Sequence, residues 1–530
     1  MKWRISTPAI KPKDSQPSPL PHSLRLKKNL NENLAQIRQH IGDSADIIMK
    51  DFRIGTAGEL GAALLYTEGL ADAAAVRDVL QALMVQLRET DLQTDSLAYP
   101  HPLKLIKDHA LPSGSVNESV DFDTMITAIL SGDSVFLLDG FDHSFIINTK
   151  GWERRAVSDS TSQTVVRGPR EGFTETLRTN TALIRRRIKH PDLQLENQQI
   201  GKYTKTDISL VYIKGIVQDQ VVEEVKQRLN RIETDSILES GYVEEWIEDA
   251  KFSPFPTVYN TDRPDVVAAN LLEGRVAILV DGTPFALLVP VLFTQFFQSA
   301  EDYYQRADIS SLLRLLRYLA FFISLLGPSF YIAVTTFHQE LIPIELLIGL
   351  SAQREGVPFP AFVEALFMEL TFEILREAGL RMPRAIGQTV SIVGALVLGE
   401  AAIQAGLASP AMVIVVSITA LSTFVLPSIS IAVPNRILRF VFMSLAASFG
   451  LFGIAVGLVA MILHLCSLKS FGVPYLSNVG PLLLSEQQDV IFRMPNWFTR
   501  QRPAVINQNN RTRKKTKGWS LFAKSTPPKS

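Results

Sequence analysis

Long stretches without a charged residue constrain this chain more than any other feature of its sequence. Residues 318–337 contain no Asp, Glu, Lys or Arg, and further runs without these residues follow in the C-terminal half. About 20 consecutive apolar residues suffice for a helix to cross the hydrocarbon core of a bilayer. The pattern predicts an all-α polytopic transmembrane domain at 301–468, with spans at about 318–337, 386–405, 410–428 and 440–468.

The segment 341–379, between the first two predicted spans, does not fit a simple crossing. Two prolines break it early, and a charged stripe with Glu369, Glu373 and Glu377 then follows one side of a helical pattern. At membrane depth such a stripe faces protein, water or the interface, not lipid. Three interpretations stay open: a re-entrant or interfacial helix, a helix buried in the bundle with paired charges, or the lining of an oligomeric pore.

Basic residues flank the predicted membrane domain at both ends. Arg306, Arg314 and Arg317 precede the first span, and residues 469–530 end in a strongly basic tail. The positive-inside rule places both flanks in the cytosol, which requires an even number of crossings, and we expect four. That topology leaves the arginines between the later spans outside, against the rule. A fifth crossing at 358–379 would move those arginines inside but would move the tail outside.

The N-terminal part has the pattern of an α/β soluble region, in which short apolar strands alternate with helices. Residues 131–140 and 273–282 both read as a strand followed by an Asp-Gly turn, with Asp139 and Asp281 in the same place. We predict two similar subdomains; chance similarity of two common hairpins is the alternative. The predicted parts are a disordered arm at 1–40, subdomains at 41–150 and 206–300, and a connecting segment at 151–205.

Arginines are concentrated in the connecting segment, where a Gly/Pro loop precedes a basic helical pattern. The candidates for contact with a partner are Arg167, Arg170, Arg185, Arg186 and Arg187. A solvated or inter-domain helix face is the alternative interpretation. No nucleophile–base pair accompanies these arginines, and no phosphate-binding loop is visible, so we expect neither an enzyme nor a cofactor. The single cysteine argues against a Cys-cluster metal site, and 53 basic against 53 acidic residues give no case for nucleic-acid binding.

Several motifs in order resemble the A subunits of the GerA family of spore germinant receptors, and the resemblance runs from about residue 45 to 495. They are Arg167-Gly-Pro-Arg-Glu-Gly-Phe173, Thr179-Asn-Thr-Ala-Leu-Ile-Arg-Arg-Arg187, Ser329-Phe-Tyr-Ile-Ala-Val334, Phe337-His-Gln-Glu340, Arg354-Glu-Gly-Val-Pro-Phe-Pro360, residues 394–405 with Glu400, and Pro410-Ala-Met-Val-Ile-Val-Val416. The N-terminal arm and the basic tail depart from the pattern.

The resemblance implies a place in the inner spore membrane, with the N-terminal domain facing the spore core. It implies a transporter-like B subunit that senses the germinant, a lipoprotein C subunit, and a homo-oligomeric ring that conducts ions. Carried to this sequence, the channel interpretation makes Val357 a candidate apolar gate, and Glu369, Glu373 and Glu377 candidates for lining the pore.

Other functions stay open at this stage. A secondary transporter is one, although no inverted hydropathy repeat is visible. A non-conducting scaffold is another. A third is a paralogue similar to stage V sporulation protein AF, which shares the A-subunit pattern. The sequence does not name the germinant.

Overall fold

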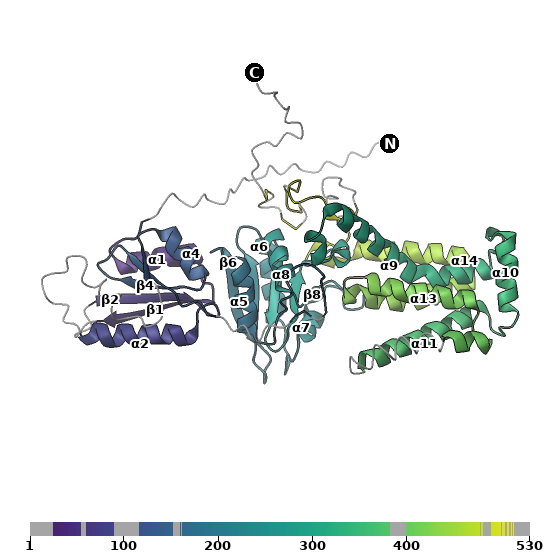
Figure 1. Cartoon of the computed structure of the whole chain (residues 1–530), viewed down its shortest axis with the longest axis horizontal. Coiled ribbons are helices and arrows are strands. Elements are labelled where there is room, and N and C mark those ends of the chain that lie inside the picture. The colour runs from purple at the N-terminus through teal and green to yellow at the C-terminus, as the bar shows by residue number, and fades with distance from the viewer. Residues whose placement is uncertain are drawn as a thin grey trace, which may run out of the picture. The chain divides into compact units, whose positions relative to one another are not determined.

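The structure, a computed structural model, describes residues 25–54, 60–89, 116–151, 159–160, 162–381, 399–477, 479–480, 489–499, 501–503, 506–507, 510 and 512–513 (Figure 1). The chain divides into two compact units. The first comprises residues 1–247, 260–290 and 496–530, and the second comprises 248–259 and 291–495. The first unit contains two five-stranded sheets, and the second contains the long apolar helices.

The first subdomain is a sheet with the strand order β1-β2-β4-β5-β3, and its neighbouring strands are antiparallel. Side chains alternate between the two faces of a strand, so Ala63 and Leu65 pack with α1 and α4, whereas Ala62 and Leu64 pack with α2 (Figure 1). Its elements are α1 (Leu30–Ile41), β1 (Ile47–Ile54), β2 (Leu60–Thr67), α2 (Ala73–Glu89), β3 (Val116–Ser119), α4 (Phe122–Leu130), β4 (Ser134–Leu138) and β5 (Ser144–Ile147).

The second subdomain repeats the strand order, as β6-β7-β9-β10-β8. The prediction of two similar α/β subdomains is therefore confirmed. Its elements are α5 (Leu177–Arg187), β6 (Leu193–Ile200), β7 (Thr206–Ile213), α6 (Asp219–Asn230), α7 (Ser240–Ile247), β8 (Tyr259–Thr261), α8 (Pro264–Glu273), β9 (Val276–Val280) and β10 (Ala286–Val289).

Both subdomains begin earlier than the sequence suggested. Residues 30–40, expected in a disordered arm, form α1 because Leu30, Ile37 and Ile41 give it one apolar face, which is buried. Residues 177–200, expected in the connecting segment, form α5 and β6, and β6 pairs with β7 along its whole length. Residues 1–24 of the expected arm lie outside the described residues.

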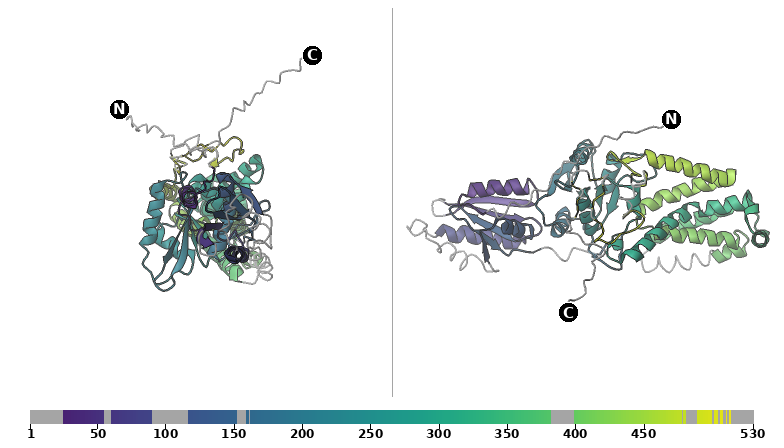
Figure 2. Two further views of the ribbon diagram at one scale, coloured as in Figure 1. Left: turned by 90° about the vertical axis from the view of Figure 1, so that its left-hand side faces the viewer. Right: turned by 90° about the horizontal axis from the view of Figure 1, so that it is seen from above.

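The helical unit contains five helices of eleven or more residues, among the residues that the structure describes. α10 lies across one end of this unit (Figures 1 and 2). The elements of the helical unit are η1 (Phe293–Phe297), η2 (Ala300–Tyr303), α9 (Ala307–Thr336), η3 (Gln339–Leu341), α10 (Ile344–Arg354), α11 (Ala361–Arg381), α13 (Pro410–Val425), α14 (Ile429–Ser467), β11 (Lys469–Ser470) and β12 (Val473–Pro474).

The start of the expected basic tail belongs to the helical unit. Tyr475 is buried there and its hydroxyl donates to the carbonyl of Pro256 at 2.8 Å. Asp489 accepts a hydrogen bond from Arg314 on α9 at 3.0 Å. The described residues 469–477 and 489–495 therefore pack within the helical unit, because Tyr475 and Asp489 find partners there.

The element α14 consists of two helical arms. Gly450 has φ 61° and ψ −141°, which are not helical values. A Cβ atom at Gly457 would lie 2.8 Å from the ring of Phe442, whereas a straight helix would hold these residues ~22 Å apart. The chain therefore folds back at Gly450, and the span expected at 440–468 is not one continuous helix.

Two of the described helices, Ala307–Thr336 and Ile429–Ser467, are long and apolar enough to cross a membrane, the second when its two arms are counted as one element; Pro410–Val425 is a shorter apolar helix. The span expected at 386–405 lies mainly outside the described residues, which resume at 399 in helical conformation. The segment expected to be re-entrant or interfacial, 341–379, forms α10 and α11. The number of crossings stays a prediction.

Candidate functional site: paired charges among the apolar helices

Two carboxylates of α11 pair with two arginines of α14. Arg439 Nη1 donates to Glu369, and Arg436 donates to Glu373, with Arg436 Nε 2.9 Å from Oε1. The glutamates are four residues apart and the arginines three apart, so each set lies on one face of its helix. Two successive ion pairs therefore join α11 to α14.

The inner pair is enclosed by four helices. Glu369 and Arg439 are both fully buried. Arg439 Nε donates to the carbonyl of Ser324 on α9 at 2.8 Å, and its Nη2 lies 3.3 Å from the hydroxyl of Thr423 on α13. Desolvating two charges is costly, and the cost is offset only when both partners and their hydrogen bonds are present. Loss of either charge would therefore affect the packing of all four helices.

A third carboxylate, Glu364, is buried at the first turn of α11. Its Oε1 accepts hydrogen bonds from the backbone N–H, at 2.6 Å, and the hydroxyl of Ser409, the N-cap residue of α13. Its Oε2 has no hydrogen-bond partner in the part of the chain that the structure describes, and it lies 3.9 Å from Arg354 Nε. A carboxylate is favoured beside two helix N-termini, where the backbone N–H groups carry partial positive charge.

These charged side chains form a series along α11, which we call the polar ladder. Its members are Arg354, Glu364, Glu369, Glu373, Arg436 and Arg439. Arg376, one turn beyond Glu373, places its guanidinium 5.1 Å from the ring centroid of Phe424, a cation–π distance. Polar groups thus follow α11 through a unit whose other side chains are largely apolar.

The predicted pore residues do not all belong to the polar ladder. Glu369 and Glu373 do, through their arginine partners. Val357 lies half-buried in the loop between α10 and α11, where its N–H donates to the Arg354 carbonyl at 3.0 Å. Glu377 is exposed and pairs with Arg381 one turn later on the same helix.

The predicted partner-contact arginines fall into three environments. Arg167 and Arg170 are exposed. Arg186 and Arg187 both bind Glu171, the latter with Nη2 at 2.8 Å from Oε2. Burial raises the pKa of Glu171, but the hydrogen bonds and charges of the two arginines outweigh it and hold the pKa below its ordinary value.

Arg185 is fully buried and is not available for contact with a partner. Its Nε donates to Asp46 Oδ2 at 2.7 Å, and Nη2 donates to Ser44 and to the carbonyl of Leu193. Asp46 precedes β1, and Arg185 lies on α5, so the pair joins the two subdomains. Three successive arginines look alike in sequence, whereas Arg185 points inward from the helix and Arg186 and Arg187 are partly exposed.

The sequence interpretation missed the roles of Arg436 and Arg439. It counted them only as flanking charges for topology, although their three-residue spacing, like the four-residue spacing of the glutamates on α11, places both on one helix face. That pattern, with opposite charges at three- and four-residue intervals in two apolar segments, was the available signal. The structure shows that these four residues form two ion pairs between α11 and α14.

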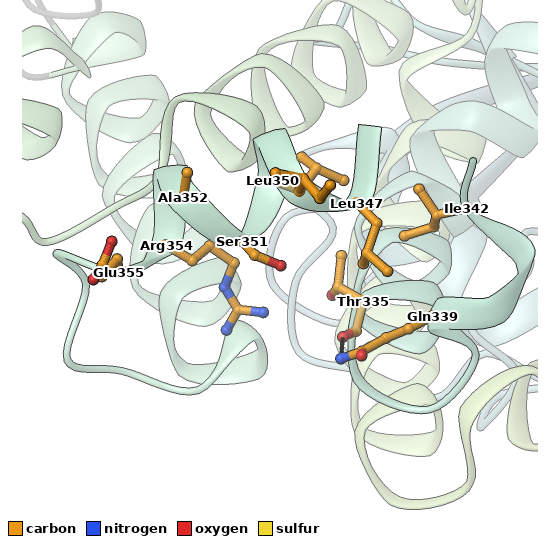
Figure 3. Close-up of a pocket in the computed structure, with 10 residues that line it drawn as sticks. Thr335, Gln339, Ile342, Leu347, Leu350, Ser351, Ala352, Arg354 and Glu355 are labelled. Atoms are coloured by element: carbon orange, nitrogen blue, oxygen red, sulfur yellow. Dashed lines mark hydrogen bonds between the residues drawn. The ribbon is translucent and has the colours of Figure 1, made fainter. Parts of the chain in front are cut away.

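A cleft of about 680 Å³ lies beside the polar ladder at the end of the unit where α10 is found. The residues that line it are Thr335, Gln339, Ile342, Leu347, Ile348, Leu350, Ser351, Ala352, Arg354 and Glu355. Figure 3 shows the side chain of Arg354 extending into the space between Ser351 and Thr335. Among the described residues, no group of three or more His, Cys, Asp or Glu side chains could hold a metal ion.

The chain thus combines a duplicated antiparallel α/β region with a helical unit that has internal charge pairs and two helices apolar enough to cross a membrane. The sequence pattern described as "Bacillus/Clostridium GerA spore germination protein" matches residues 35–505. The chain therefore belongs to the GerA family of spore germination proteins, which is not known as an enzyme family.

Curated relatives cover nearly the whole chain. Spore germination protein KA of Bacillus subtilis (strain 168) is 47% identical over 488 residues, which are 92% of this chain and 88% of that one. Spore germination protein GerLA of Bacillus cereus is 39% identical over 490 residues, or 92% and 98% of the two chains. The chain is also similar to the crystal structure of the N-terminal domain of the A subunit of the Bacillus megaterium spore germinant receptor GerK3. The matched sequences are 43% identical and the TM-score is 0.41; the match covers 51% of this chain and 98% of that chain.

Proposed function

We propose that this protein is the A-type membrane subunit of a nutrient germinant receptor and forms, as a homo-oligomer, an ion channel that opens when the germinant is sensed. The observation that carries the proposal is the buried Glu369–Arg439 pair inside an apolar helical unit. Ionisable residues at membrane depth are costly and are retained mainly where they serve ion movement or its control.

The surface of the helical unit supports a position in a membrane, which we assign to the inner spore membrane. Large apolar side chains are exposed on three helices: Leu312, Leu319 and Phe330 on α9, Ile414 and Leu421 on α13, and Phe452 and Leu463 on α14. Contiguous exposed apolar surface is unfavourable in water and favourable against lipid. We place the α/β region on the side of the spore core, following the basic residues before the first span.

Assembly completes the proposed receptor. A transporter-like B subunit and a lipoprotein C subunit are the expected partners, and the B subunit is the expected germinant sensor. Contact with a second copy of this chain would form the pore, with the loop at Val357 as its gate and the carboxylates of α11, among them the exposed Glu377, as its cation-attracting groups. The relatives support the receptor role, because they are spore germination proteins.

The proposal is tested in spores that carry Val357→Ala in the full receptor. A smaller apolar side chain widens the gate and weakens the dewetting that closes it, so we expect release of monovalent cations without nutrient. Val433→Ala, which shortens an exposed valine on α14, is the matched control and leaves dormancy intact.

Two results would count against the proposal. If spores with Val357→Ala stay dormant and respond normally to nutrient, Val357 is not the gate. A strain that lacks this chain and still germinates normally with every nutrient to which the parent responds removes the receptor role itself. Cation flux through liposomes that contain the complete receptor, stimulated by nutrient, separates a channel from a non-conducting scaffold.

A further inference from the structure

The cleft beside α10 combines one charged group with an apolar wall. Arg354 supplies the cation, and Ile342, Leu347 and Leu350 supply half-buried apolar side chains. The volume of about 680 Å³ lies in the range of sites for small organic molecules. Such a lining suits a molecule with a charged head and an apolar body.

The guanidinium of Arg354 lies within ion-pair distance of Glu364 but makes no hydrogen bond to it. Its nearest carboxylate oxygen, Glu364 Oε2, is 3.9 Å from Nε, which is too long for a hydrogen bond. The Nε atom is buried and makes no hydrogen bond with the residues that the structure describes, and Glu364 Oε2 is equally unpartnered. Buried polar atoms nearly always have partners, so the unpartnered Nε–H of Arg354 indicates a bound group that accepts its hydrogen bond.

The walls around Arg354 are polar on the side of α9. Gln339 is held by a hydrogen bond of 2.8 Å from its Nε2 to the carbonyl of Thr335 (Figure 3). Ser351 presents a hydroxyl to the same space. Arginine binds carboxylate and phosphate groups through parallel N–H donors, and the neighbouring hydroxyl and amide add further donors to an oxyanion.

Glu355 also lines the cleft and restricts what can enter. A second carboxylate beside Arg354 disfavours a multiply charged anion through like-charge repulsion. The surface of α10 continues the apolar wall outward, since Ile344, Leu346 and Ile348 are exposed. The occupant that fits is therefore singly charged, with its apolar part directed along α10.

We propose that the cleft between α9 and α10 binds an amphiphilic anion, with its oxyanion head on Arg354 and its apolar body against Leu347 and Leu350. A bound anion accepts hydrogen bonds from the guanidinium of Arg354, while Glu364 keeps its hydrogen bonds from Ser409. The anion thereby replaces the Arg354–Glu364 ion pair between α10 and the start of α11. The head group is carried either by an anionic phospholipid or by a free organic carboxylate.

Native mass spectrometry of the purified full chain in detergent tests the site. The probes are phosphatidylglycerol, phosphatidylcholine and octanoate, so that the lipid and free sources are compared. We expect the chain to retain phosphatidylglycerol in preference to phosphatidylcholine, or to bind octanoate. Arg354→Gln is expected to lower the affinity for the anion by roughly tenfold or more, as for the loss of a charge-assisted hydrogen bond.

Arg381→Gln is the matched control, because Arg381 is an exposed arginine that, among the described residues, forms its ion pair with Glu377 of the same helix. Leu350→Trp fills the cleft while keeping Arg354, so it also lowers anion occupancy and covers the case in which Arg354→Gln does not fold. Binding of phosphatidylglycerol alone assigns the site to lipid, and binding of octanoate alone assigns it to a free carboxylate. The proposal is overturned if neither anion binds the unmodified chain, or if both Arg354→Gln and Leu350→Trp retain its occupancy.

Discussion

Asp139 and Asp281 make the same hydrogen bond in the two subdomains. Asp139 Oδ1 accepts the N–H of Leu30 at 2.9 Å, and Asp281 Oδ1 accepts the N–H of Leu177 at 2.9 Å. The following glycines, Gly140 and Gly282, each donate to a carbonyl just before the same helix at 2.8 Å. Each Asp-Gly turn therefore holds the start of the helix that opens its own subdomain, which extends the repeat back to α1 and α5.

Replacing either aspartate with alanine should loosen the first turn of its helix. The N–H groups at a helix start have no partner within the helix, and loss of a capping acceptor costs about 1 kcal/mol. Asp139→Ala should lower the local opening free energy at Leu30 by that amount, and Asp281→Ala should do the same at Leu177. Hydrogen exchange of these amides in the full chain measures the effect. Asp139→Asn keeps an acceptor oxygen and should change it much less; equal effects of the two substitutions would contradict the assignment.

The buried Arg185–Asp46 pair should be a major stabilising contact between the subdomains. Arg185→Met leaves Asp46 charged and buried without its partner, and breaking such a pair costs roughly 3–5 kcal/mol. Pulse proteolysis of the full chain in urea should show the α/β unit unfolding at a lower urea concentration. The exposed Arg170 provides the control, since Arg170→Met should leave the midpoint unchanged.

A double variant checks that charge pairing is the cause. In Asp46→Asn with Arg185→Met no uncompensated charge remains, so part of the lost stability should return. A double variant that is less stable than Arg185→Met would show that packing of the arginine stem, and not the ion pair, carries the effect.

The sequence predicted the duplicated subdomains through their Asp-Gly hairpins, because a two-residue turn is a local signal. It missed α1 and α5 as the openings of these subdomains. The contact that anchors each opening helix comes from an aspartate more than 100 residues later, which local patterns do not reveal. Composition alone favoured a disordered arm, although α1 carries a narrow apolar face.

In the helical unit, too, the sequence predicted local elements and missed the long-range contacts between them. Apolar runs predicted helices, but the pairing of Glu369 with Arg439 joins residues 70 positions apart. The fold-back at Gly450 was missed because a glycine in an uncharged run is equally compatible with a continuous helix. The charged stripe on α11 was recognised, and its partners were not.

Neutralising one member of the Glu369–Arg439 pair should impair folding more than neutralising both. Either Glu369→Gln or Arg439→Gln leaves one buried charge uncompensated, whereas the double variant replaces both charges with neutral groups that can hydrogen-bond. The monodisperse fraction of the full chain after detergent extraction, measured by size-exclusion chromatography, should fall in each single variant and recover partly in the double.

The exposed Glu377–Arg381 pair supplies the comparison for this experiment. Glu377→Gln should leave the monodisperse fraction close to that of the unmodified chain, because an exposed pair within one helix contributes only ~0.3–0.5 kcal/mol. A double Glu369→Gln, Arg439→Gln variant no better than the worse single variant would indicate that the arginine's bonds to Ser324 and Thr423 dominate.

The hairpin in α14 predicts a cross-link that a continuous helix forbids. Gly457 approaches the ring of Phe442 across the turn at Gly450, whereas a straight helix would separate the two residues by ~22 Å. In a chain with Cys466→Ser, the pair Phe442→Cys and Gly457→Cys should be joined by a short bifunctional thiol reagent, detected as an intact cross-linked peptide after digestion. Each single cysteine variant should give none within a chain. If the pair fails to cross-link while both thiols still react with a monofunctional reagent, the result favours a continuous helix. This segment would then cross the membrane once and would not form two antiparallel arms.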